Sequence, residues 1–258
     1  KTIPGKEEFH ETLRYFGRQL ELSGVTVRLG QRVGAEALAG FDEIVLATGI
    51  VPRTPAITGI NHPMVLSYLD VLRDHQPVGR RVAIIGAGGI GFDTAEYLTQ
   101  HGESASLSPE AFTREWGIDM TLSQRGGLSP RGPAPEPSPR EVFLLQRKKS
   151  KVGDGLGKTT GWIHRTGLKN KNVQMLNSVE YLKIDDAGLH IRIGAEGEPQ
   201  VLAVVTSSTC WRASRVRMIS SPLMYRVSSA RMRSCAEGPS HSRKVAKMTA
   251  MPKQQRAK

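Results

Sequence analysis

The 258-residue chain is 38% hydrophobic, enough to bury the core of one large or two modest domains. It contains no apolar run of the roughly 18 residues that cross a membrane and no recognisable signal peptide, so we expect a cytoplasmic protein without a membrane partner. Of its formal net charge of +12, residues 204–258 carry +11, from 12 Lys and Arg residues against Glu237; the nearly neutral remainder argues against nucleic acid as a partner.

The first part of the chain predicts a helix and two strands. Residues 6–23 have apolar side chains at near-helical spacing, residues 25–29 alternate as a short strand does, and residues 41–48 predict a second, buried strand. The turn Ala47-Thr48-Gly49 closes this segment. It has two interpretations: a turn that brings the backbone close to a ligand, or an ordinary strand exit. Residues 66–73 predict a short helix that leads into the next unit.

A glycine motif lies at the centre of the chain. Residues 82–85 form the apolar run of a strand buried on both faces, and residues 92–100 predict an amphipathic helix. Between them, the segment Gly86-Ala87-Gly88-Gly89-Ile90-Gly91 has the G-x-G-x-x-G spacing of a dinucleotide site. The first glycine permits the turn, the second admits a pyrophosphate, and the third lets the helix press against the strand. A tight turn without a ligand is the alternative.

A long insertion separates this helix from the next strand. Residues 102–140 are rich in proline and glycine, as functional or disordered insertions are, and residues 112–122 have room for a helix. Residues 141–146 then predict the second strand of the unit. NAD-specific sites place an acid at the end of this strand, whereas here Arg147 and Lys148 follow. Basic side chains with no acid beside them favour binding of the 2′-phosphate of NADPH. The alternative interpretation is a basic turn that is exposed to solvent and binds no ligand.

The rest of the regular sequence is a glycine-rich segment and a group of strands. Residues 153–165 open a helix that continues to about residue 169, but they lack the spacing of a Walker phosphate loop. His164 stands alone in this segment, which favours a packing or surface role over catalysis. Strands are predicted over residues 173–176, 179–184 and 189–193.

Four extended stretches, in order, resemble the C-terminal half of bacterial NADPH-dependent 2,4-dienoyl-CoA reductases. They are IPGKEEFHETLRYF, FDEIVLATGIVPRTPAITGINHPMVLSYLDVL, RVAIIGAGGIGFDTAEYL and GLGKTTGWIHR, and the resemblance runs to about residue 203. It implies an α/β, Rossmann-like flavoprotein with two dinucleotide-binding domains, each a parallel sheet with helices on both faces. Residues 1–79 would be part of an FAD domain, with Ala47, Thr48 and Gly49 near the flavin. Residues 80–203 would be an NADPH domain, with the glycine motif at the pyrophosphate and Arg147 and Lys148 at the 2′-phosphate.

The resemblance also implies parts that this sequence does not contain. In the family, an FMN barrel with an iron–sulfur cluster precedes these domains, and electrons pass from NADPH through FAD, the cluster and FMN to the dienoyl-CoA. The barrel, its cluster cysteines, the substrate acid and the first FAD glycine motif are missing here, so no catalytic residue is assigned. We expect the chain to take part at most in the hydride step from NADPH to FAD.

The sequence changes character after residue 203. Residues 204–258 lack the glycine-rich closing segment that the resemblance leads one to expect, and they show no sustained helix or strand period. Cys210 and Cys235 lie in this tail, and their spacing fits no zinc site. We expect this tail to be either an out-of-frame reading of the gene or a disordered segment. A basic tail that binds nucleic acid is the alternative.

We therefore expect the NADPH-oxidising portion of a 2,4-dienoyl-CoA reductase, a flavoprotein oxidoreductase of fatty acid β-oxidation. One alternative is a related multi-cofactor flavin enzyme that acts on an enone or a trimethylamine-type substrate. A second alternative is a nucleotide-binding fragment without turnover.

Overall fold

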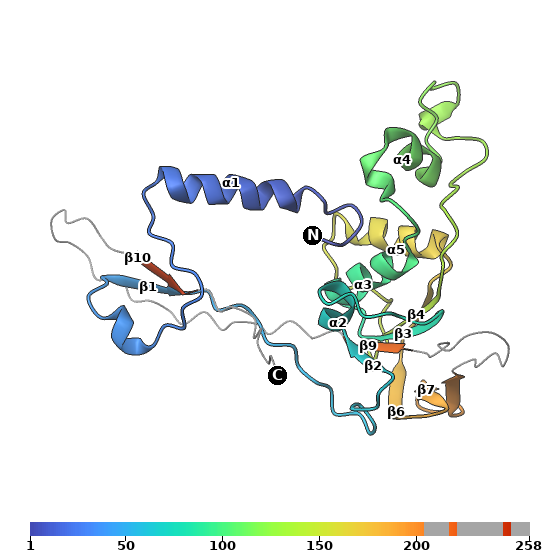
Figure 1. The fold of residues 1–258 in the computed structure, drawn as a ribbon. Helices are drawn as coiled ribbons and strands as arrows, with labels where there is room; N and C mark the ends of the chain where they lie inside the picture. Colours follow the sequence, from blue (N-terminus) through green and yellow to red (C-terminus); the bar gives the residue numbers. More distant parts are fainter. Residues whose placement is uncertain (204–216, 221–244, 249–258) are drawn as a thin grey trace. The chain divides into compact units, whose positions relative to one another are not determined.

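The computed structural model describes residues 1–203, 217–220 and 245–248 (Figure 1). The chain divides into two compact units. Unit 1 comprises Lys1–Thr12 and Arg53–Leu223, and unit 2 comprises Leu13–Pro52 and Met224–Lys258. The expected cofactor-domain boundaries at residues 79 and 203 stay predictions.

Unit 1 is built on a parallel five-stranded sheet. Its order is β2-β9-β3-β4-β5, with bounds Val65–Ser67, Arg217–Ser220, Arg81–Ile85, Glu141–Leu145 and Gln174–Leu176. The strands predicted over residues 82–85 and 141–146 form β3 and β4, which pair in register from Arg81–Glu141 to Ile85–Leu145. Such uniformly apolar strands are stable only where both faces of a sheet are covered.

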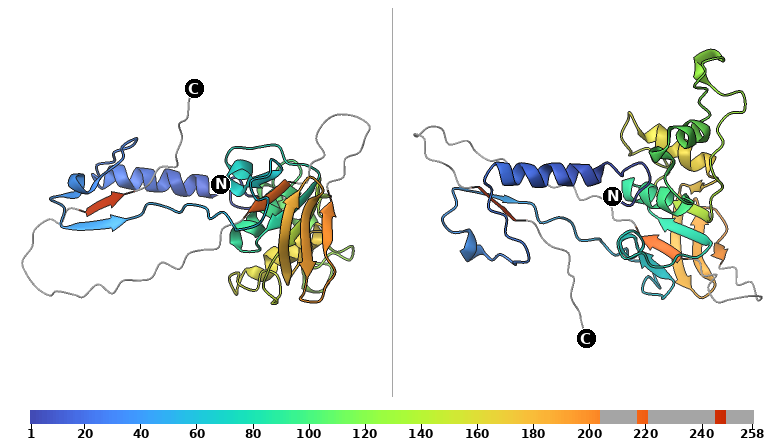
Figure 2. Two further views of the ribbon diagram at one scale, coloured as in Figure 1. Left: turned by 90° about the horizontal axis from the view of Figure 1, so that it is seen from below. Right: turned by 45° about the horizontal axis from the view of Figure 1, so that its top comes forward.

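Helices cover one face of this sheet (Figures 1 and 2). They are α2, Tyr68–Leu72; α3, Gly89–Thr99; and α5, Gly161–Asn170. Val82 and Ile84 of β3 pack there with Phe92 of α3 and Leu168 of α5, and each of these side chains is at most 1% exposed. This face therefore fixes the start of α3 above the end of β3.

The other face is covered by a second sheet. β6, Val179–Asp185, β7, Gly188–Ile193, and β8, Gln200–Ala203, form an antiparallel three-stranded sheet. Ala83 and Phe143 of the parallel sheet share a core with Leu189 and Ile191 of β7. The α/β Rossmann-like class is confirmed, but the expected helices on both faces need correction: among the described residues, strands replace helices here. An antiparallel sheet such as this one can pack one face on the core and expose the other face to solvent.

The insertion at residues 102–140 contains short elements of its own. They are η2, Ala105–Leu107, α4, Pro109–Trp116, and η3, Arg125–Gly127. The Ser108 hydroxyl caps α4 by accepting from the Ala111 N–H, and Gly117, at φ 67°, ends it before the predicted limit of residue 122.

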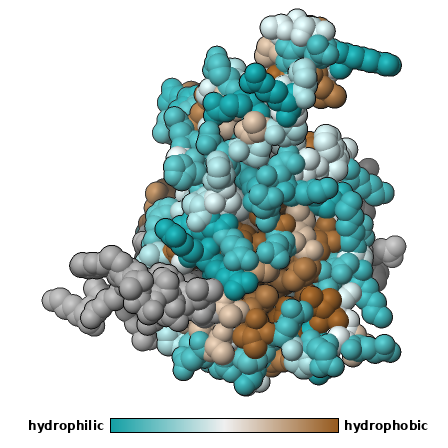
Figure 3. All heavy atoms as spheres, turned by 90° about the vertical axis from the view of Figure 1, so that its right-hand side faces the viewer, coloured by the Kyte–Doolittle hydropathy of each residue, from teal (hydrophilic) through white to brown (hydrophobic). Residues whose placement is uncertain are grey.

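In Figure 3, hydrophilic residues predominate on the face shown, apart from an apolar area in its lower half.

Unit 2 contains few regular elements among its described residues. Most of α1, Phe9–Leu22, belongs to it, with η1, Ala35–Leu38, and β1, Glu43–Leu46, which pairs in parallel with β10, Val245–Met248. The prediction of a strand over residues 25–29 was wrong, because these residues pair with no other strand in the described structure. Alternation of apolar and polar residues does not by itself supply the partner strand that a β-strand needs.

The tail is described only over β9 and β10. The expectation that residues 204–258 are out of frame or disordered otherwise falls outside the described residues, as do Cys210 and Cys235. Within the described ranges, no helix is long and apolar enough to cross a membrane.

Candidate nucleotide site

The glycine turn connects β3 to α3. Gly86 follows the strand directly, at φ 107°, a left-handed value that glycine adopts without a steric penalty. Its N–H donates to the Leu145 carbonyl over 2.9 Å, which ties the turn to β4. Gly88 is the N-cap of α3, and its carbonyl accepts the first helical hydrogen bond, from Phe92 N–H, over 3.0 Å.

The glycines of this turn differ in the space around them. A Cβ atom added to Gly91 would lie 2.0 Å from the Gly86 carbonyl oxygen and 3.4 Å from Leu144 Cδ1. A Cβ atom at Gly88 or Gly89 would meet nothing within 4 Å. Gly91 is thus needed for close packing within the protein, whereas Gly88 and Gly89 leave open space beside the backbone.

The start of α3 has the chemistry of an anion site. No side chain caps it among the described residues. The N–H groups of a first helical turn have no partner within the helix, and the helix dipole favours negative charge there. The open space at Gly88 and Gly89 gives a pyrophosphate room to approach these N–H groups, so the turn fits a dinucleotide. Ala87 and Ile90 line the turn, and Ala87 packs partly on the helical core.

Arg147 and Lys148 lie at the same edge of the sheet as the turn. Because Ile85 and Leu145 are paired in parallel, the residues that follow β3 and β4 leave neighbouring strands side by side. Both basic side chains are exposed. We call residues 147–151 the basic loop; its sequence, Arg-Lys-Lys-Ser-Lys, contains no acid. The structure thus brings together the two parts of the predicted nucleotide site.

Tyr181, on β6, lies beneath the glycine turn and was not predicted. Its hydroxyl lies beside the Gly86 backbone, yet it is buried without a hydrogen bond of good geometry among the described residues. Burial raises the pKa of the Tyr181 phenol well above its usual range, although the nearby Arg147 charge acts in the opposite direction. Because Tyr181 comes from another sheet, no local spacing signals its place at the turn.

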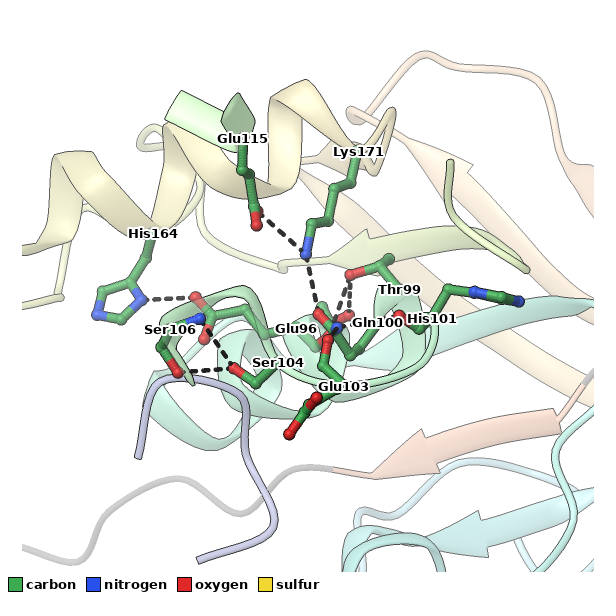
Figure 4. A network of polar contacts seen from close by, with 11 residues as sticks. Glu96, Thr99, Gln100, His101, Glu103, Ser104, Ser106, Glu115, His164 and Lys171 are labelled. Atoms are coloured by element: carbon green, nitrogen blue, oxygen red, sulfur yellow. Dashed lines mark hydrogen bonds and ion pairs between the residues drawn. The ribbon is translucent and has the colours of Figure 1, made fainter. Parts of the chain in front are cut away.

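His164 pairs with a carboxylate of the neighbouring helix α3 (Figure 4). Its Nδ1 atom, on α5, lies 2.6 Å from Oε1 of Glu96 on α3, and the two side chains are 32% and 21% exposed, respectively. Burial is the main cause that raises the pKa of Glu96, and the His164 contact offsets part of this effect. This packing role agrees with the one favoured for a lone histidine.

Further polar contacts lie beside the His164–Glu96 pair, near α3. Lys171 Nζ lies 3.3 Å from Glu115 Oε1 and 3.4 Å from Gln100 Oε1 (Figure 4). Lys6 Nζ, from the first residues of the chain, lies 2.6 Å from Asp93 Oδ1. The outward face of α3 is thereby joined to α5, to the insertion and to the first residues of unit 1.

Ala47, Thr48 and Gly49 belong to unit 2 and are exposed. The strand expected over residues 41–48 forms as β1, but its expected burial was wrong, because all four residues of β1 are exposed. Helix α1 likewise buries no residue. The described residues of unit 2 therefore form no enclosed surface for a flavin isoalloxazine. Across the described ranges, no group of three or more His, Cys, Asp or Glu side chains is placed to hold a metal ion.

Comparison with known proteins gives a family and several relatives. The family model described as pyridine nucleotide-disulphide oxidoreductase matches residues 13–208. The cinnamate reductase of Clostridium sporogenes is 35% identical over 112 residues, which are 41% of this chain and 16% of that protein. The bilirubin reductase of Mediterraneibacter gnavus is 32% identical over 106 residues, 40% of this chain and 16% of that protein. The chain thus spans a small part of both relatives.

Solved structures share the fold. A 2-naphthoyl-CoA reductase, in a complex with 2-naphthoyl-CoA, aligns with a TM-score of 0.57 at 21% identity, over 85% of this chain and 26% of that one. A histamine dehydrogenase from Rhizobium sp. 4-9 aligns with a TM-score of 0.52 at 16% identity, over 85% of this chain and 29% of that one. At these identities the likeness concerns the fold alone.

Proposed function

Because the chain belongs to the pyridine nucleotide-disulphide oxidoreductase family, we propose that unit 1 is the NADPH-binding part of a flavin-dependent reductase. The observation that carries this proposal is the adjacency of two features at one sheet edge. The glycine turn, with its uncapped helix start, follows β3, and the basic loop follows β4. A Rossmann site holds the pyrophosphate at the first position and the ribose 2′ substituent at the second.

The residues of this site have distinct tasks in the proposal. The backbone around Gly88 and Gly89 holds the pyrophosphate, and Arg147 and Lys148 hold the 2′-phosphate through charge-assisted hydrogen bonds. When bound, nicotinamide and flavin would supply the hydride chemistry. The chain contributes binding and orientation, and in the complete protein Ala47, Thr48 and Gly49 would lie near FAD.

For the complete protein we propose a 2,4-dienoyl-CoA reductase of fatty acid β-oxidation, with an upstream FMN barrel and iron–sulfur cluster. The four resembling stretches support it. The names of two relatives, which refer to the reduction of cinnamate and of bilirubin, also support the reduction of an unsaturated substrate. A related enzyme for an enone or trimethylamine-type substrate is the second candidate, because the resemblance implies that the substrate binds in the upstream barrel.

Titration of the purified chain with NADPH and with NADH tests the proposal. We expect NADPH to bind more tightly, and Arg147→Ala or Lys148→Ala to weaken it about tenfold, the effect of losing a charged hydrogen bond. NADH affinity should stay unchanged. Lys169→Ala is the matched control, because Lys169 is an exposed base on α5 outside the site.

Three results would oppose the proposal. A chain that binds neither nucleotide removes the cofactor assignment. Tighter binding of NADH removes the role given to Arg147 and Lys148. Binding to DNA that weakens steeply with salt would favour a nucleic-acid-binding fragment instead.

A further inference from the structure

Gln146, the first residue after β4, has an unusual environment for its position. It is 9% exposed, and the buried polar side chains among the described residues are Gln146, Thr94 and Thr99. The two threonine hydroxyls donate within α3, to the carbonyls of Ile90 and Ala95. Gln146 instead reaches forward, out of its strand and into the basic loop.

The side-chain amide of Gln146 donates to the backbone of that loop. Its Nε2 atom lies 2.8 Å from the Ser150 carbonyl oxygen and 3.2 Å from the Lys148 carbonyl oxygen. One buried amide group thus holds two carbonyls that lie two residues apart. The loop is folded around this group, so its backbone shape depends on an N–H donor at residue 146.

Residues after β5 hold the same loop from its other side. Asn177 Nδ2 donates to the carbonyls of Lys149 and Ser150 over 3.2 and 3.3 Å, and the Ser178 N–H donates to the Lys148 carbonyl over 3.0 Å. Three consecutive carbonyls of the loop therefore accept hydrogen bonds from the protein.

Holding the carbonyls in this way leaves the basic side chains outside. The four bases of the loop are exposed, and among the described residues none pairs with an acidic side chain: Arg147, Lys148, Lys149 and Lys151. A fixed loop with unpaired bases binds an anion with little loss of backbone entropy. The loop lies beside the glycine turn, because Leu145 pairs with Ile85.

We propose that Gln146 is a positioning residue that sets the preference for the phosphorylated nucleotide, an inference that rests on the proposed function. It acts through the basic loop, since its donors are occupied by the Lys148 and Ser150 carbonyls. A carboxylate at this position would repel both carbonyls and any 2′-phosphate beside them. The amide is therefore required for the loop as well as compatible with the phosphate.

The test compares Gln146→Met, which keeps the length but removes the donors, with Gln146→Glu, which also adds charge. Affinities for NADPH and NADH are measured by fluorescence titration of the purified chain, and thermal melting checks folding. We expect the NADPH-to-NADH preference to fall about tenfold in Gln146→Met and further in Gln146→Glu, while NADH affinity changes less than about twofold.

Asn177→Ala tests the same loop from its second anchor and keeps the inference testable if a Gln146 variant fails to fold. It should also lower the preference for NADPH, because the Lys149 carbonyl loses its donor. Equal loss of both nucleotides in the variants would indicate a merely structural role and overturn the inference. A wild-type preference for NADPH that all variants retain overturns this inference alone. A wild-type chain without that preference overturns the proposed function and the inference together.

Discussion

Gly91 packs directly against the backbone of Gly86, so that a Cβ atom at Gly91 would lie 2.0 Å from the Gly86 carbonyl oxygen. Gly86 follows β3 and Gly91 lies in the first turn of α3. The backbone oxygen of Gly86 cannot rotate away as a side chain can. We predict that Gly91→Ala lowers the free energy of unfolding by about 1–3 kcal/mol, the range for overpacking.

Urea unfolding of the variant and the wild type measures this effect. Gly89→Ala is the control, since its Cβ would meet nothing within 4 Å and its backbone is helical. Equal stability of Gly91→Ala and the wild type would show that the turn relaxes without strain.

Gly88→Ala should separate binding from folding. Its φ of −87° suits any residue, and its Cβ would enter open space in the free protein. The methyl group would occupy the approach to the start of α3, so we expect unchanged stability and about tenfold weaker NADPH binding. Fluorescence titration measures the binding, and unchanged affinity would remove the pyrophosphate from this turn.

The stability of unit 1 should depend on pH through Glu96. Burial raises its pKa in the folded state above the ordinary glutamate value of about 4.3. The folded protein therefore binds this proton more tightly than the unfolded chain does. The contribution is fully present below the unfolded pKa and is lost as pH rises through the raised folded pKa.

Comparison of Glu96→Gln with the wild type in urea at pH 4 and pH 7 isolates this contribution. We expect the variant to gain stability relative to the wild type as pH rises across the window. Glu103→Gln is the control, because Glu103 is exposed. A stability difference between Glu96→Gln and the wild type that does not change with pH would contradict the burial effect.

The purified chain should retain little flavin. The described residues of unit 2 around Ala47–Gly49 are exposed and enclose no surface. Visible absorbance after gel filtration in the presence of FAD measures retention. A yellow chain with stoichiometric flavin would show that unit 2 forms a complete FAD site.

The glycine turn could be predicted because its signal is local: an apolar run, three glycines at fixed spacing and a helix period follow one another. Arg147 and Lys148 could be placed at its edge because consecutive parallel strands end side by side. The Gln146 contacts could not be predicted, since they depend on the fold of the loop after the strand. Tyr181 also escaped, because it reaches Gly86 from another sheet.

The errors have the same physical origin. The alternation over residues 25–29 describes a surface that suits a strand, but a strand also needs a partner. Residues 200–203, Gln-Val-Leu-Ala, are too short for a clear period, and they form β8 because β7 offers a pairing edge. The sheet that replaces helices on the second face likewise follows from long-range pairing.

A crystal structure of the chain with NADPH bound is the most direct test of the proposed nucleotide site. We predict that the pyrophosphate contacts the backbone at Gly88 and Gly89, and that the 2′-phosphate contacts Arg147 or Lys148. A nucleotide bound elsewhere on the protein, or one whose 2′-phosphate points away from the basic loop, would show that these residues do not form the site.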